Sequence, residues 1–204
     1  SWLSHYDKKQ VLNPLEKNIS YKEFINKELI HFSNYDNNRS IPSFCDGNKP
    51  SQRKALYTFF AKNIVKELKV AQVTGYVTSE TAYHHGESSM EGTIVGLAQD
   101  YVGSNNINLL RPEGMFGTRI QGGKDCAQSR YIFTHLEKIA RSIYKKDDEP
   151  LLNFLYEEGK GIEPDWYVPI IPMILVNGSH GIGTGFSTHV PCYNPKDIIT
   201  NIQC

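Results

Sequence analysis

The sequence lacks long hydrophobic runs and has few cysteines. None of its apolar runs approaches the roughly 18 residues that a membrane-spanning helix needs, which argues against a membrane protein. The four cysteines, Cys45, Cys126, Cys192 and Cys204, lie far apart and form no CxxC pair. This spacing suggests neither a zinc site nor a disulfide framework, and it favours a reducing compartment. An initiator Met and the apolar segment of a secretory signal are also missing, so we expect the chain to begin inside a longer protein.

The sequence has no net charge, since 22 Lys and Arg residues balance 22 Asp and Glu residues. This balance argues against a strongly basic nucleic-acid binder. The distribution is uneven, because residues 39–69 contain seven basic and two acidic residues, whereas residues 145–165 contain three basic and seven acidic ones. A second basic cluster consists of Arg111, Arg119, Lys124 and Arg130. One face of the molecule could therefore be basic, although ordinary solvated helix faces would give the same pattern.

Hydrophobic periodicity predicts a mainly helical α+β domain. Helices are expected over residues 21–32, 50–64, 66–77 and 88–103, the second opened by Pro50 and the last capped by Ser88. Glycine-separated apolar segments within residues 105–123 predict a hairpin, and a further helix is expected to begin near Tyr131. Short helices followed by a hairpin are the layout of a winged helix-turn-helix domain, a scaffold that commonly lies on DNA.

Tyr131 is the leading candidate for chemistry. The expected helix places it in the first turn, on the polar side and directly after Arg130. Free backbone N–H groups and the guanidinium would favour a bound phosphate there. The same positive field would favour the phenolate form of Tyr131, which is the better nucleophile toward phosphorus. The alternative is an aromatic residue at the rim of an amphipathic helix, without a catalytic role.

Two further segments carry candidate sites. His84 and His85 precede an expected helix, which suits a phosphate contact better than a metal site, because no second cluster would complete a metal shell. Residues 167–176 are β-prone and lead into a glycine-rich loop over residues 177–185. The loop departs from both the nucleophile-elbow and the dinucleotide-binding patterns. An exposed Ile182 within it could wedge between base steps of a duplex.

Longer motifs, in order along the chain, carry a more specific signal. They are SIP (40–42), DG (46–47), KPSQRK (49–54), YHHGE (83–87), GSNN (103–106), FGTR (116–119), GGKD (122–125), RY (130–131), EP (163–164), WY (166–167), PM (172–173), NG (177–178) and GIGTG (181–185). Together they resemble the breakage-reunion region of eukaryotic-type DNA topoisomerase II, over roughly residue 21 to the end. The forms YHHGE and KPSQRK are similar to those of the eukaryotic and large-DNA-virus enzymes.

The resemblance implies a role for each candidate residue. Tyr131 would attack a backbone phosphodiester and form a 5′-phosphotyrosine link. Arg130 would stabilise the negative charge of the transition state, and His85 would bind near the scissile phosphate. Ile182 resembles the residue that intercalates and bends the DNA. The residues expected to hold the cleaved segment are Arg39, Lys49, Arg53 and Lys124.

The same resemblance implies three segments. Residues 1–30 would be a connecting arm after a TOPRIM domain, 31–170 a winged-helix (CAP-like) DNA-gate domain, and 171–204 the beginning of an α/β tower domain. Mg²⁺ and ATP would be bound by other domains of the complete enzyme, so no metal ligand is expected in this chain, and the fragment alone should be inactive.

The expected partners and location follow from the same family. The complete enzyme would bind double-stranded DNA as a homodimer. It would lie in the nucleus if cellular, or in the host cytoplasm or a virus factory if it comes from a large DNA virus. The alternative function, from another class, is a non-catalytic winged-helix module that binds DNA.

Overall fold

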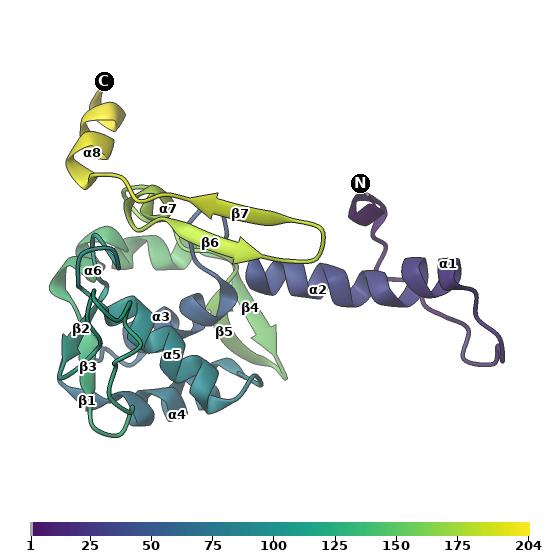
Figure 1. Ribbon diagram of the computed structural model, residues 1–204, viewed down its shortest axis with the longest axis horizontal. Coiled ribbons are helices and arrows are strands. Elements are labelled where there is room, and N and C mark those ends of the chain that lie inside the picture. Colours follow the sequence, from purple (N-terminus) through teal and green to yellow (C-terminus); the bar gives the residue numbers. More distant parts are fainter. Residues whose placement is uncertain (1) are drawn as a thin grey trace.

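Three helices packed on a small sheet form the core of the molecule (Figure 1). The computed structural model describes residues 2–204. The helices are α3 (Pro50–Ala61), α4 (Val70–Thr81) and α5 (Glu87–Ala98). The sheet has the order β1-β3-β2 with antiparallel pairing throughout, and its strands are β1 (Leu68–Lys69), β2 (Leu110–Glu113) and β3 (Phe133–Leu136). This arrangement is the mainly helical winged-helix α+β fold that the sequence predicts.

The three core helices confirm the periodicity of the sequence. In α3, Pro50 occupies the first turn, and Leu56, Phe59 and Phe60 are buried, as predicted. The bounds 66–77 predicted for the next helix were wrong, because residues 68–69 pair with β3 as strand β1 and α4 runs from Val70 to Thr81. Helix α5 begins at Glu87 with Gly86 as its N-cap, so the predicted cap at Ser88 was wrong, and it ends earlier than predicted, at Ala98.

The predicted hairpin within residues 105–123 was wrong in its strand pairing. Strand β2 pairs with β3, and the long loop 114–132 joins them. The helix predicted from Tyr131 was also wrong, because this segment enters β3. Every second side chain here is buried, namely Ile132, Thr134 and Leu136, which is the period of a strand. Strand β3 also pairs with a neighbour on each side, β1 and β2. Helix α6 (Lys138–Ile143) begins only afterwards.

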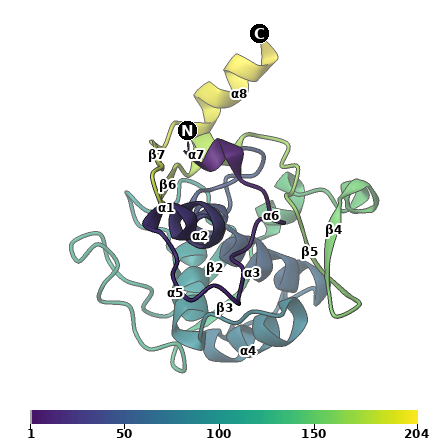
Figure 2. The ribbon, with the colours of Figure 1, turned by 90° about the vertical axis from the view of Figure 1, so that its right-hand side faces the viewer.

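The segments on either side of the core extend away from it. A helical run from Tyr21 to Ser40 projects as a rod, longer than the predicted helix over 21–32 (Figure 1). Helix α8 projects in another direction, and the β4–β5 hairpin lies at the edge of the body (Figure 2). The rod consists of α1 (Tyr21–Phe24), the π-helix η2 (Ile25–Leu29) and α2 (Ile30–Ser40). The 3-10 helix η1 (Trp2–His5) precedes it in the chain. The later elements are the 3-10 helix η3 (Lys146–Leu151), β4 (Phe154–Glu157), β5 (Lys160–Pro164), α7 (Met173–Val176), β6 (Ser179–Ile182), β7 (Ser187–Val190) and α8 (Pro195–Gln203).

Residues 167–204 differ from the expectation in two places. The β-prone residues 167–176 form no strand and end in the short helix α7, while the glycine-rich segment after them forms the β6–β7 hairpin. Two glycines let this hairpin lie against α2. A Cβ at Gly181 would collide with the carbonyl oxygen of Ser40, and a Cβ at Gly183 would collide with Oδ1 of Asn37. Only glycine permits so close an approach.

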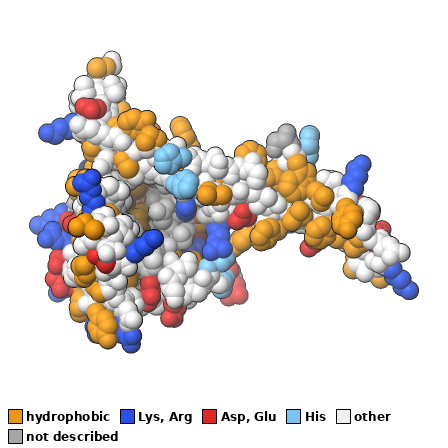
Figure 3. Space-filling model, in the orientation of Figure 1, with side chains coloured by type: hydrophobic (Ala, Val, Ile, Leu, Met, Phe, Trp, Pro, Cys, Tyr) orange, Lys and Arg blue, Asp and Glu red, His pale blue; other side chains and the backbone are white. Residues whose placement is uncertain are grey.

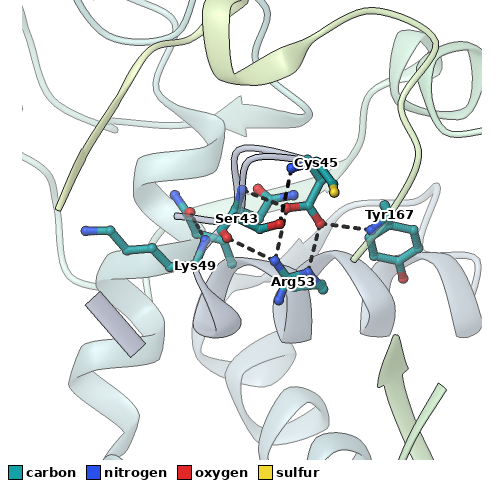
Figure 4. Close-up of polar contacts among 8 residues, drawn as sticks. Ser43, Cys45, Lys49, Arg53 and Tyr167 are labelled. Atoms are coloured by element: carbon teal, nitrogen blue, oxygen red, sulfur yellow. Dashed lines mark hydrogen bonds and ion pairs between the residues drawn. The ribbon is translucent and has the colours of Figure 1, made fainter. Parts of the chain in front are cut away.

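A buried ion pair joins the loop after α2 to the start of α3 (Figure 4). Nε of Arg53 donates to Oδ2 of Asp46 at 2.8 Å, and Nη2 donates to Oδ1 at 3.0 Å. Their side chains are only 6% and 0% exposed. Asp46 also accepts the backbone N–H groups of Asn48 and Tyr167, both at 2.9 Å, and Nη2 donates to the carbonyl of Asn48. The network holds three separate chain segments together.

We predict that Asp46→Ala strongly destabilises the 204-residue chain. The substitution leaves the Arg53 guanidinium buried without its counter-ion, which costs about 3–5 kcal/mol in comparable sites. Urea unfolding followed by circular dichroism measures this free energy. Glu113→Ala is the matched control, because it breaks an ion pair with Arg111 at the surface and should cost only a small fraction of that amount. Equal losses in the two variants would contradict a central role for the buried pair.

Candidate nucleic-acid interface

Tyr131 stands on a turn that is anchored to the core. Its backbone N–H donates to the carbonyl of Gln128 at 2.9 Å. The first N–H groups of α4 hold the same turn: Val70 donates to the carbonyl of Ile132 at 3.1 Å, and Ala71 donates to that of Ser129 at 3.3 Å. These are donors that a helix N-terminus leaves without an intrahelical partner. The Tyr131 side chain is 66% exposed, so an exposed phenol projects from a fixed backbone.

Arg130 lies beside this phenol. Its guanidinium carbon is 5.2 Å from the centroid of the Tyr131 ring. Both Nε, at 2.9 Å, and Nη2 donate to Oε1 of Gln128, which orients the guanidinium without neutralising it. The predicted exposure of Tyr131 beside a cation is confirmed. The helix predicted to begin at Tyr131 is absent. The N-terminus of α4 lies beside this turn, but its first N–H groups donate to backbone carbonyls, so Arg130 supplies the free positive charge next to the phenol.

His85 lies in a second group of polar side chains, where α2 meets the start of α3. Its Nε2 is 2.6 Å from Oη of Tyr35, and its ring also contacts the buried ring of Tyr83. Desolvation and the positive charge of Arg39 lower the pKa of His85, which favours the neutral imidazole. Together with Lys54, these side chains line a cavity of about 170 Å³. The cavity combines two cations, Arg39 and Lys54, with an imidazole and a phenol hydroxyl.

Tyr35 was missed by the sequence reasoning. It precedes Arg39 by four residues on α2, so both side chains lie on one face of that helix. An exposed tyrosine one turn before an arginine is a weak signal, and nothing in the sequence links it to His85, fifty positions away.

Three more candidates lie at the surface. Lys49 is half-buried immediately before α3, and its long side chain extends from the loop in Figure 4. Lys124 is exposed in the loop 114–132. Ile182 is 68% exposed at the end of β6, beside the hairpin turn. The predicted exposure of Ile182 is therefore confirmed. On the face shown in Figure 3, Lys and Arg side chains border a hollow in the body.

Arg53 does not fit the expected set of DNA contacts. Its guanidinium is buried against Asp46 and the carbonyl of Asn48, so its donors are already used within the chain. We correct its role from DNA binding to holding the loop that precedes α3. A pattern of basic residues in sequence cannot distinguish a buried, paired arginine from an exposed one.

The cations divide into two groups. One group forms ion pairs with carboxylates in the chain and consists of Lys27, Arg53, Lys54, Lys62, Arg111, Arg141 and Lys160. In contrast, Arg39, Lys49, Lys124 and Arg130 make no ion pair with any carboxylate in the described part of the chain. Eleven further Lys and Arg residues within 2–204 also lack a carboxylate partner, so it is the sequence motifs that single out these four, and the absence of a partner leaves them available to an external anion.

Other interpretations of the motifs find no support in the geometry. His84 lies 3.3 Å from a carboxylate oxygen of Glu157, and residues 2–204 include no group of three His, Cys, Asp or Glu side chains that could hold a metal ion. Asn177–Gly181 leads from α7 into β6, whereas a nucleophile elbow leads from a strand into a helix. No helix in the same range is long and apolar enough to cross a membrane.

Similarity to known proteins identifies the family. A family model for the A-type subunit of DNA gyrase/topoisomerase IV matches residues 39–204. The chain belongs to this topoisomerase family. A second family model, described as the C-terminal associated domain of TOPRIM, matches residues 1–37. The second match ends at residue 37 and the first begins at residue 39, so the boundary between the two matched segments lies inside α2. One continuous helix therefore belongs to both segments. The predicted divisions of this topoisomerase chain after residues 30 and 170 stay predictions.

Individual relatives agree with this assignment. The chain is 57% identical over 202 residues to DNA topoisomerase 2 of Saccharomyces cerevisiae and 56% identical over 203 residues to DNA topoisomerase 2 of Arabidopsis thaliana. These matches cover 99% and 100% of this chain but only 14% of each relative. The crystal structure of the Plasmodium falciparum topoisomerase II DNA-binding, cleavage and re-ligation domain superposes with a TM-score of 0.88 at 54% identity, covering 99% of this chain and 28% of that one. The resemblance to eukaryotic-type topoisomerase II is thereby confirmed.

We predict that Arg39→Ala raises the pKa of His85. Desolvation lowers this pKa most, and the Arg39 charge lowers it further, so removing the charge moves the pKa back toward the ordinary histidine value. An NMR titration of the imidazole C–H signals measures the shift. Arg111→Ala, which removes an exposed arginine on β2, serves as the control and should leave the pKa of His85 unchanged. An unchanged value in Arg39→Ala would show that the guanidinium does not act on this imidazole.

Proposed function

We propose that this chain is the DNA-cleavage and rejoining part of an ATP-dependent type II DNA topoisomerase (isomerase EC 5.6.2.2). The observation that carries the proposal is the exposed Tyr131 phenol on a backbone anchored by α4, beside an Arg130 guanidinium that has no carboxylate partner. Membership of the family supports the same reaction. A non-catalytic DNA-binding module would not need a fixed, exposed phenol beside a cation, so we do not favour that alternative.

The proposed reaction exchanges one phosphodiester bond for another. Tyr131 Oη attacks the phosphorus atom of a DNA backbone phosphodiester and gives up its proton, and the bond to the 3′ oxygen breaks. The leaving 3′ oxygen takes up a proton, and the 5′ phosphate stays bonded to the tyrosine. The reverse attack by the 3′ hydroxyl rejoins the strand. One ester bond is made for each one broken, so rejoining requires no separate source of energy.

Arg130 and His85 would stabilise the reacting phosphate. A guanidinium beside the phenol can donate to the oxygens on which negative charge develops in the transition state, an effect typically worth about 10²–10³ in rate for one donor. The neutral His85 imidazole can donate a hydrogen bond to a phosphate oxygen or accept one from a hydroxyl. Hydrogen bonding to Tyr35 would hold this ring in place.

The other exposed candidates would hold and bend the duplex. Arg39, Lys49 and Lys124 would contact phosphates, which positions DNA without reading its sequence. Ile182, at the end of the β6–β7 hairpin, would insert between base steps and kink the duplex. A homodimer would present two Tyr131 side chains, one for each strand of double-stranded DNA, so that a second duplex could pass.

Mg²⁺ and ATP belong to the proposal only for the complete protein. The described residues include no group of three His, Cys, Asp or Glu side chains that could hold a metal ion, and we derive no step through Mg²⁺. The chain spans about 14% of the relatives that it matches, which leaves room in a complete protein for domains that bind both cofactors. We also propose a nuclear location for a cellular protein, and the host cytoplasm or a virus factory for a viral one.

Tyr131→Phe in the full-length protein should abolish covalent DNA adducts and leave DNA binding nearly unchanged. The substitution removes only the nucleophilic oxygen and keeps the exposed ring. Denaturing electrophoresis of labelled DNA detects adducts, and fluorescence anisotropy measures binding. Tyr193→Phe, at another half-exposed tyrosine, is the control and should still form adducts. Adducts that persist in Tyr131→Phe would refute the role of this residue.

Arg130→Ala should slow cleavage far more than it weakens binding. We expect a cleavage rate about 10²-fold lower, because the guanidinium acts mainly on charge that develops in the transition state. Single-turnover cleavage with saturating protein separates rate from affinity. Lys124→Ala provides the comparison, since a phosphate-positioning lysine should lower affinity and leave the saturated rate nearly intact. Equal losses of rate and affinity in Arg130→Ala would indicate simple positioning.

A further inference from the structure

Two histidines face each other across the β6–β7 hairpin. His180 and His189 are register partners in this antiparallel pair. Their ring centroids lie 5.5 Å apart, with the ring planes 78° from each other. Figure 3 shows two adjacent histidine side chains at the surface over this hairpin. Both side chains are exposed, and neither has a role in the proposed cleavage reaction.

The ladder of the hairpin brings these two rings close together. The N–H of Gly183 donates to the carbonyl of Phe186 at 2.9 Å, which makes these two residues a hydrogen-bonded pair at the turn. Hydrogen-bonded and non-hydrogen-bonded pairs alternate along an antiparallel ladder. His180 and His189 lie three pairs beyond Gly183 and Phe186, so they form a non-hydrogen-bonded pair. Side chains at such pairs stand closer than at hydrogen-bonded ones, with Cβ atoms about 4.5–5.5 Å apart.

The histidine pair lies on the outward face of the hairpin. Gly181 lies against the end of α2, so the residues that alternate with it point away from α2. His180 and Ile182 are two positions apart on β6 and therefore share this outward face. The histidines consequently reach solvent beside the side chain that we propose as the DNA wedge.

The separation of the rings suits a shared metal ion. Zinc–nitrogen bonds to histidine are about 2.0–2.1 Å, so two imidazoles on one tetrahedral ion place their ring centroids about 5 Å apart. The observed 5.5 Å requires only a small adjustment of exposed side chains. Neutral imidazole suits zinc, copper and nickel ions in particular. We propose that His180 and His189 form a binding site for a divalent transition-metal ion of this class.

The proposed site has two protein ligands. No third His, Cys, Asp or Glu joins the pair among residues 2–204, so water or an external ligand would fill the other positions. The ion would bridge β6 and β7 two residues from Ile182, and it would thereby stiffen the hairpin. This inference does not depend on cleavage by Tyr131. A solvated edge-to-face pair of rings without metal affinity is the competing interpretation.

Copper binding to the full-length protein tests the site. Cu²⁺ is the probe because imidazole sites bind it most tightly among the first-row divalent ions, and its EPR spectrum shows the number of coordinating nitrogens. His180→Gln and His189→Gln each remove one ligand and keep a polar side chain of similar size. His5→Gln is the matched control, since it replaces an exposed histidine in η1, at the opposite end of the sequence from the hairpin.

The wild-type protein and His5→Gln should bind one Cu²⁺ with a two-nitrogen EPR signature that both hairpin variants lose. Losing one of two linked ligands should weaken this binding by about tenfold or more. Circular dichroism and DNA affinity of the variants identify any general loss of folding. Well-folded hairpin variants that retain the two-nitrogen signal, or a wild-type protein that lacks it, would overturn the proposal.

Discussion

The buried ion pair between Asp46 and Arg53 is the constraint on which the arrangement of the interface depends. It joins the loop after α2 to the first turn of α3, and the same carboxylate accepts the backbone N–H of Tyr167. Removing two charges from water is costly, and here that cost is offset by a bidentate contact and by backbone donors that satisfy the carboxylate. The ends of α2 and α3, which carry Arg39 and Lys49, are thereby held in fixed relative positions.

The chain uses its basic residues in two different ways. Buried or paired cations such as Lys54, which contacts Glu163 at 2.8 Å, stabilise contacts between elements. Exposed cations without a carboxylate, such as Arg130, keep their charge available to an external anion. A chain of zero net charge can still present a basic surface, because its basic residues cluster over 39–69 while its acidic residues cluster over 145–165. A total charge count averages over both groups and therefore conceals the surface that we propose binds DNA.

The β6–β7 hairpin shows how one local geometry can serve two purposes. Glycines on its inward side permit backbone contact with α2, while the alternation of the strands sends Ile182 and the histidine pair outward. A side chain at Gly181 would collide with the backbone of α2 and push the hairpin away from it. The wedge and the proposed metal site thus depend on the same close packing, although different side chains carry them.

The sequence by itself determined the winged-helix class, the core stripe of α3 with Leu56 and Phe59, and the exposure of Ile182, because periodicity and motif spacing are local properties. The exposure of Tyr131 was predicted from a helix that does not form, and the turn before β3 exposes this side chain instead. The sequence did not determine the strand at Phe133–Leu136, because a short apolar run is compatible with both the helical period of 3.6 and the strand period of 2. Pairing with β1 and β2 decides for the strand. Only the tertiary structure decided that Arg53 is buried, that Tyr35 meets His85, and that His180 faces His189. Each of these contacts joins residues whose separation depends on how the whole chain packs, and no local pattern records it.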